Sequence, residues 1–122
     1  MPLHALARAG LAVTLLLGLV GTAHALTLNS DEFKTHRRPA VIFNHDAHNE
    51  RAKLEDCAVC HHGGDNGVID PEMTTADLPC SECHKATAPR GRTPLMRAFH
   101  KNCIQCHRDL NKGPTTCGGC HK

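Results

Sequence analysis

The sequence Cys57-Ala-Val-Cys60-His61-His62 decides how this chain folds. Cys-x-x-Cys-His is the attachment sequence for c-type haem. The two thiols bond to the porphyrin, and the histidine that follows can bind the iron from one side. The pattern recurs at Cys80–His84, Cys103–His107 and Cys117–His121, so four motifs use all 8 cysteines of the chain. We therefore predict four covalently bound c-type haems.

Each motif supplies two attachment thiols and one proximal iron ligand. The predicted attachment residues are Cys57, Cys60, Cys80, Cys83, Cys103, Cys106, Cys117 and Cys120, and the proximal ligands are His61, His84, His107 and His121. A Cys-x-x-Cys pair by itself would also fit a zinc site or a disulfide scaffold. The histidine that follows all four pairs favours haem over both alternatives.

The first 25 residues are typical of a cleaved secretory signal peptide. Arg8 supplies the positive charge, Leu11–Val20 form the apolar segment, and Ala23-His24-Ala25 is a small-residue cleavage site. The alternative is a membrane anchor, but the apolar run of about a dozen residues is shorter than the roughly 20 that a spanning helix needs. We expect export to the periplasm and one tetrahaem domain over residues 26–122.

Large apolar side chains are scarce in this domain. The chain has no Trp, no Tyr and 3 Phe. So short a chain buries little surface, and the gain would barely offset the entropy lost on folding. We therefore expect a small fold of mostly α-helix and loop with little β, in which four haems form the core. The haem-free chain should be largely unfolded.

Local patterns predict two helices. Asn44 can cap a short helix on which His45 and His48, three residues apart, share a face. Thr93-Pro94 is a cap followed by proline, and it should begin the longest helix, roughly residues 94–109.

The rest of the domain is expected to have little regular structure. Leu26–Phe33 should be an irregular or short extended segment, and Ala40–Phe43 a brief β run. We interpret Gly63–Gly67 as a flexible loop and Val68–Leu78 as an irregular connector.

Counting histidines predicts the remaining iron ligands. Outside the motifs and the signal region, His36 lies in a polar, basic stretch and is interpreted as solvated. Four candidates then remain for four sixth positions: His45, His48, His62 and His100. His62 adjoins His61 and points away from it, so it should serve a neighbouring haem.

Bis-histidine ligation would leave no open coordination site. The irons could then pass electrons but could not bind and activate a substrate. Two imidazoles also hold the potential below that of a haem with a methionine ligand. The count thus predicts a low-potential electron carrier and not an enzyme. The alternative is a multihaem reductase of metal or sulfur compounds with one open haem site.

The segment Phe43-Asn44-His45-Asp46-Ala47-His48, followed by Cys-x-x-Cys-His-His, resembles the tetrahaem class III cytochromes c, the cytochrome c-three type. The resemblance covers Pro39–Lys122. It implies that His45 binds the first haem, His48 the third, His62 the second and His100 the fourth. It also implies periplasmic electron shuttling from a hydrogenase or formate dehydrogenase to a membrane-bound acceptor complex.

Basic residues crowd the C-terminal third of the chain. They are Arg90, Arg92, Arg97, Lys101, Arg108, Lys112 and Lys122. The set is either an ordinary solvated face or a docking patch for an acidic redox partner. Family members dock partners at a lysine-ringed fourth haem, which favours Lys101, Lys112 and Lys122. We expect a monomer that binds redox proteins, with no nucleic acid and no stable membrane anchor.

Overall fold

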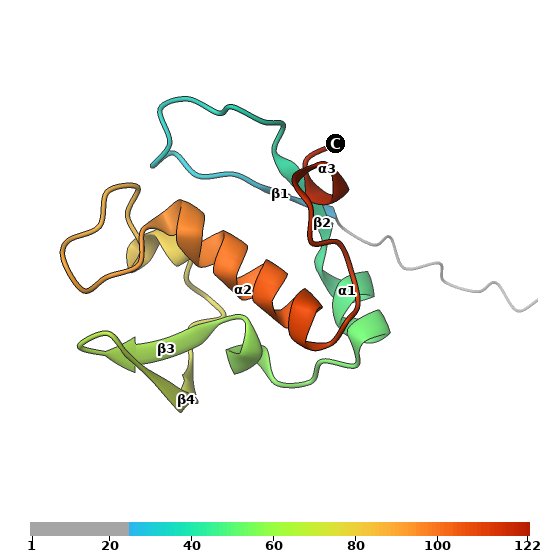
Figure 1. The fold of residues 1–122 in the computed structure, drawn as a ribbon. Coiled ribbons are helices and arrows are strands. Elements are labelled where there is room, and N and C mark those ends of the chain that lie inside the picture. Colours follow the sequence, from blue (N-terminus) through green and yellow to red (C-terminus); the bar gives the residue numbers. More distant parts are fainter. Residues whose placement is uncertain (1–24) are drawn as a thin grey trace, which may run out of the picture.

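The structure, a computed structural model, describes residues 25–122 (Figure 1). The signal peptide predicted for residues 1–25 lies, apart from Ala25, outside the described residues. Within residues 25–122, no helix has the length and apolar character needed to cross a membrane.

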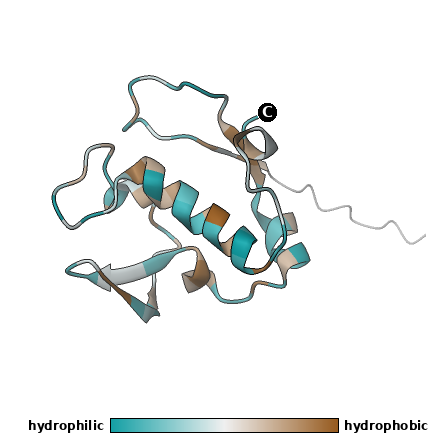
Figure 2. Ribbon diagram, viewed as in Figure 1, coloured by the Kyte–Doolittle hydropathy of each residue, from teal (hydrophilic) through white to brown (hydrophobic). Residues whose placement is uncertain are grey.

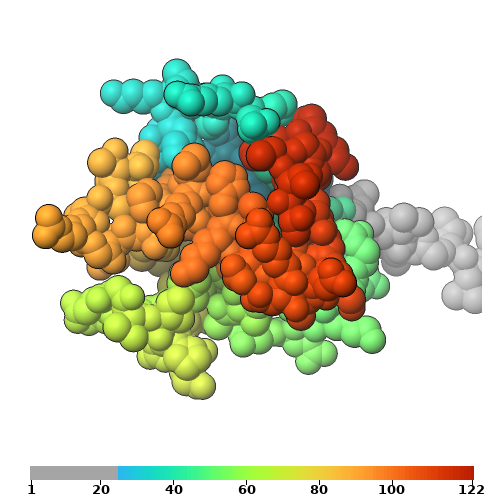
Figure 3. All heavy atoms as spheres, viewed as in Figure 1, coloured from blue at the N-terminus to red at the C-terminus, as the bar shows by residue number. Residues whose placement is uncertain are grey.

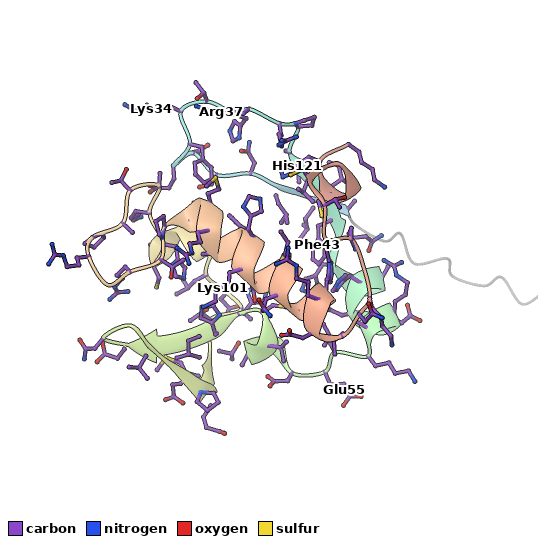
Figure 4. The ribbon with its side chains drawn as sticks, viewed as in Figure 1. Lys34, Arg37, Phe43, Glu55, Lys101 and His121 are labelled. Carbon is purple, nitrogen blue, oxygen red and sulfur yellow. The ribbon has the colours of Figure 1, made fainter. Side chains whose placement is uncertain are left out.

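Strands β1 (Ala25–Leu28) and β2 (Val41–Asn44) form the first of two small sheets. They pair antiparallel, with Leu26 opposite Phe43. This confirms the brief β run, and it shows that the first residues of the expected lead-in are extended. The loop between the strands carries the basic stretch around Lys34 and Arg37 (Figure 4).

Both predicted helices are confirmed, but the predicted Thr93 cap of the second is wrong, because Pro94 is the N-cap residue and the helix has no side-chain cap hydrogen bond. Helix α1 (His45–Ala52) is capped by Asn44, whose Oδ1 accepts a hydrogen bond from the Ala47 amide at 3.1 Å. Helix α2 (Leu95–Asp109) follows Pro94 and is the longest element of the described chain (Figure 1). The Leu95 amide donates to the Lys85 carbonyl at 2.9 Å, which fixes the start of α2 to the second motif.

Each motif adopts one helical turn. The first begins at the 3-10 turn η1 (Cys57–Val59), the second at η2 (Cys80–Glu82), the third lies within α2, and the fourth is α3 (Cys117–Cys120). In the first, second and fourth motifs, the amide of the histidine donates to the carbonyl of the first cysteine at 2.8 Å. This turn brings the histidine back over the first thiol, because residues four apart are neighbours on a helix surface.

The expected loop and connector after the first motif were wrong. Strands β3 (His62–Asp65) and β4 (Val68–Thr74) form an antiparallel hairpin with an irregularity between His62 and Gly63. The turn between them is Asn66-Gly67, with φ values of 50° and 81°. Two positive φ angles match the tight type I′ turn that Asn-Gly favours, so this dipeptide was the signal that sequence reasoning missed.

The apolar core is very small. Leu95 is fully buried and is the single buried hydrophobic residue among those described, whereas Ile42, Val68 and Ile69 are 67%, 71% and 61% exposed. Figure 2 shows polar residues along much of α1 and α2, and Figure 3 shows segments distant in sequence side by side around them. Short helices, 3-10 turns and two two-stranded sheets agree with the predicted class of small fold with little β. The four-haem core stays a prediction.

Candidate haem sites

Every motif histidine faces one histidine from outside the motifs. The ring centroids are 6.2 Å apart for His45 and His61, 6.1 Å for His48 and His107, 6.1 Å for His62 and His84, and 6.2 Å for His100 and His121. Two metal–imidazole bonds of about 2.0 Å, plus about 1.1 Å from each nitrogen to its ring centre, would place two trans imidazoles about 6.2 Å apart. All four pairs therefore have the spacing that one iron atom between them requires.

Short elements and one long helix bring these rings together. His45 and His48 lie three residues apart on α1, yet they face different motifs, the first and the third. His62 begins β3 and reaches the second motif. His100 lies on α2 ahead of the third motif and reaches the fourth. These are the partners that the family resemblance implies, and binding of iron by them stays a prediction.

Backbone carbonyls orient three of the motif histidines. The Nδ1 atom of His84 lies 2.8 Å from the Thr93 carbonyl, that of His107 lies 2.6 Å from the Pro114 carbonyl, and that of His121 lies 2.7 Å from the Pro39 carbonyl. A carbonyl only accepts, so each Nδ1 carries the proton and donates. The Nε2 atom is then unprotonated, which is the state that binds a metal.

Two further contacts hold the histidines of α1. The Nδ1 atom of His45 lies 3.0 Å from Asp46 Oδ1, whereas the Nδ1 atom of His48 is buried and has no hydrogen-bond partner among the described residues. The centroid of the Phe43 ring lies 5.0 Å from the ring centroid of His48 and 6.2 Å from that of His45. Figure 4 labels Phe43. Sequence reasoning gave Phe43 no role of its own, although it stands within the quoted motif.

The attachment thiols lie near one another. Burial raises the pKa of Cys103, and the nearby Cys60, Cys120, Cys80 and Cys106 raise it further. One cysteine of every other motif is thus near the third motif. No disulfide joins any two of the eight cysteines, all of which lie among the described residues. The described residues contain no group of three or more His, Cys, Asp or Glu side chains that could hold a metal ion.

The pair formed by His62 and His84 lies in surroundings that favour neutral imidazole. Burial lowers the pKa of His62, and the neighbouring His84 and His61 lower it further. Neutral imidazole is the form that ligates iron. The donor set and the spacing of the ring pairs therefore both fit haem iron.

Two polar side chains, Glu32 and Asn102, fix the motifs to distant segments. The Glu32 carboxylate accepts from the Ala86 amide at 3.3 Å and from Lys85 Nζ at 3.2 Å, which ties the loop after β1 to the second motif. These contacts lower the pKa of Glu32, the Ala86 amide most strongly. On α2, Asn102 Nδ2 donates to the Cys60 carbonyl at 3.1 Å and so links the long helix to the first motif.

His36 lies apart from the four pairs. It is exposed, and its ring packs edge-on against Phe33 with centroids 6.1 Å apart. This placement agrees with the interpretation of His36 as a solvated side chain.

Comparisons with known proteins identify the family that this chain resembles. The Class III cytochrome C family profile matches residues 22–121. The chain is 38% identical to cytochrome c3 of Desulfovibrio desulfuricans, over 66% of this chain and 76% of the relative, and 36% identical to cytochrome c3 of Desulfuromonas acetoxidans, over 46% and 81%. A solved cytochrome c7 of Geobacter sulfurreducens aligns with a TM-score of 0.42 and 30% identity, over 82% of this chain and 99% of that one.

Four Cys-x-x-Cys-His turns, four facing histidine pairs and the family match thus point to one conclusion. The chain belongs to the class III cytochrome c family, the multihaem cytochromes that bind c-type haem covalently and transport electrons.

Proposed function

We propose that the protein is a periplasmic, low-potential electron carrier with four covalently bound haems, each ligated by two histidines. The observation that carries this proposal is the pairing of every motif histidine with one further histidine at 6.1 or 6.2 Å. Eight histidines make four pairs, and each is used once. No iron would then keep an axial position for a substrate, which supports a carrier and not a reductase.

The residues of the chain have separate roles in this proposal. Bound haem supplies one-electron chemistry at iron. The cysteine pairs would hold the porphyrins, and each pair of imidazoles would bind one iron. The carbonyls of Thr93, Pro114 and Pro39 keep their histidines in the metal-binding tautomer. Imidazole in place of a thioether keeps the potentials low.

Haem stoichiometry and spin state test the proposal. Pyridine haemochrome absorbance should give four haems per chain, and electron paramagnetic resonance (EPR) should show only low-spin iron. The reduced protein should not bind carbon monoxide, because both axial positions are filled. One high-spin haem that binds carbon monoxide would favour the multihaem reductase with an open site. Protein without haem would overturn both functions.

We further propose that the fourth haem receives or delivers electrons at a basic groove. The groove has a volume of about 270 Å³ and lies beside His100, with Arg97, Lys101 and Arg108 in its lining. Lys101 is exposed on α2 (Figure 4). Three positive side chains beside one proposed haem would steer an acidic partner, such as a periplasmic hydrogenase or formate dehydrogenase, on its way to a membrane-bound acceptor.

Charge reversal tests this docking site. K101E and R108E should slow electron uptake from an acidic hydrogenase by about tenfold at low salt, and the difference from wild type should shrink at high salt, where charges are screened. R90E, on the exposed loop before α2 and outside the groove lining, is the control. Equal slowing by R90E would indicate a general effect of net charge and would contradict the site.

A further inference from the structure

The segment after α2 encloses the ring of His107. The Pro114 carbonyl accepts from its Nδ1 at 2.6 Å. A Cβ atom added to Gly113 would lie 2.9 Å from each of Cδ2, Cε1 and Nε2 of the ring, so the Gly113 backbone lies against the face of the imidazole. Gly113 also has a φ of 79°, in the left-handed region that favours glycine. His107 is therefore held by its Nδ1 and by one ring face.

The fourth motif packs behind this segment. A Cβ atom on Gly119 would lie 2.8 Å from Pro114 Cβ and 3.3 Å from Thr116 Oγ1. Gly118, its neighbour in Cys117-Gly-Gly-Cys120, would meet nothing within 4 Å. Close packing thus requires a glycine at position 119, which touches Pro114, but not at position 118.

The histidine pair of the third motif also differs in its geometry. The ring planes of His48 and His107 are 38° apart, whereas those of the other pairs are 61°, 74° and 73° apart. The angle between two axial imidazole planes sets how the iron d orbitals split, and it therefore affects the EPR g values. A contact that fixes the His107 ring fixes one of the two planes that define this angle.

We propose that Gly113, Pro114 and Gly119 form a positioning clamp on His107, so that the fourth attachment motif sets the axial ligand geometry of the third haem. The inference rests on the proposed haem ligation. Neither the His107 ring nor the clamp can move easily. The ring is held at Nδ1 and, in the haem-loaded protein, at Nε2, and Pro114 has a fixed φ.

Two alanine variants of the fourth motif test the clamp in the full, haem-loaded protein. G119A should displace Pro114 and change the g values of the third haem, identified through the NMR signals of His48 and His107. G118A is the matched control, because it adds the same methyl group to the same short helix and meets nothing. The EPR and NMR spectra of G118A should match those of the wild-type protein. A change in G119A confined to the fourth haem, or equal changes in both variants, would overturn the clamp.

A second matched pair tests the ring contact directly. Gly113 and Gly91 both have positive φ, 79° and 86°, but a Cβ on Gly91 would meet nothing within 4 Å. G113A and G91A therefore share the backbone strain, and only G113A pushes on His107. G113A should change the third-haem g values and G91A should not; matching spectra would contradict the contact.

Loss of haem in a variant is also informative. If G119A matures with fewer haems, mass spectrometry of its peptides locates the missing one. Absence from the peptide with Cys103 and Cys106 supports the clamp, and absence from the peptide with Cys117 and Cys120 alone overturns it. Wild-type protein without haem would refute the proposed function itself, whereas four low-spin haems with an unaffected third haem in G119A and G113A would refute only the clamp.

Discussion

The surroundings of each histidine ring distinguish the proposed iron ligands from His36. His84, His107 and His121 each donate from Nδ1 to a carbonyl, and each faces a second imidazole. His36 has only an edge contact with Phe33. A facing imidazole ring with its centroid about 6 Å away distinguishes all eight predicted ligands from the solvated histidine, and an oriented Nδ1 accompanies it in His84, His107 and His121.

Replacing one proposed ligand should change one potential. We expect H100M to raise the potential of the fourth haem, because a thioether favours ferrous iron, by part of the roughly 0.8 V range that axial ligands span. Potentiometric titration followed by visible absorbance measures the four potentials. H36M is the control and should leave all four unchanged. If every haem shifted equally in H100M, or none did, the pairing of His100 with His121 would be wrong.

Glu32 predicts a pH dependence of stability. The Ala86 amide and Lys85 lower its pKa below the usual 4.5. The folded state therefore binds this proton more weakly than the unfolded state, and the stabilisation is present above pH 4.5 and is lost as the pH falls through the lowered pKa. E32Q should melt below wild type at pH 7, and the difference should shrink as the pH falls below 4.5. D31N, at the adjacent position, is the control, and a difference that stays constant across this range would contradict the contact.

At the scale of elements, α1 is the most consequential. It is eight residues long, and it presents His45 to the first motif and His48 to the third. So short a helix is marginal by itself, so its ends and its packing decide whether it forms. Asn44 supplies the cap, and Phe43 packs against both histidines.

Removing the cap should disturb two haems together. N44A loses the hydrogen bond to the Ala47 amide, which should cost about 1 kcal/mol of stability. Denaturant unfolding of the haem-loaded protein measures this loss, and NMR of the ferric protein should show changes at the first and third haems. N44D keeps a cap oxygen and should behave like wild type. Changes at the second or fourth haem alone would contradict the role of α1.

At the scale of the whole molecule, the polypeptide does not enclose a core of its own. Leu95 is the single buried hydrophobic residue among residues 25–122, and large apolar side chains such as Val68 and Met96 are exposed. A domain of this size needs more burial than that to offset the entropy of its chain. The four porphyrins are expected to supply the missing apolar surface.

The haem-free chain should accordingly be unfolded. We expect protein made without haem attachment, or with the eight cysteines changed to alanine, to lack a cooperative thermal transition in circular dichroism and to exchange its amide hydrogens rapidly. The haem-loaded protein is the control and should melt cooperatively. A cooperative melt of the haem-free chain would show that the polypeptide has a sufficient core.

The sequence by itself determined the attachment motifs, both longer helices and the eight histidines that form pairs, because these depend on fixed spacings and local caps. The count of histidines from the residues alone left open which ring faces which. The tertiary structure decided that His48 meets His107, 59 positions further along the chain, since the two rings come from helices that are far apart in the sequence. It also decided the packing of Gly119 on Pro114, because a close approach between atoms of two chain segments leaves no periodic pattern in the sequence.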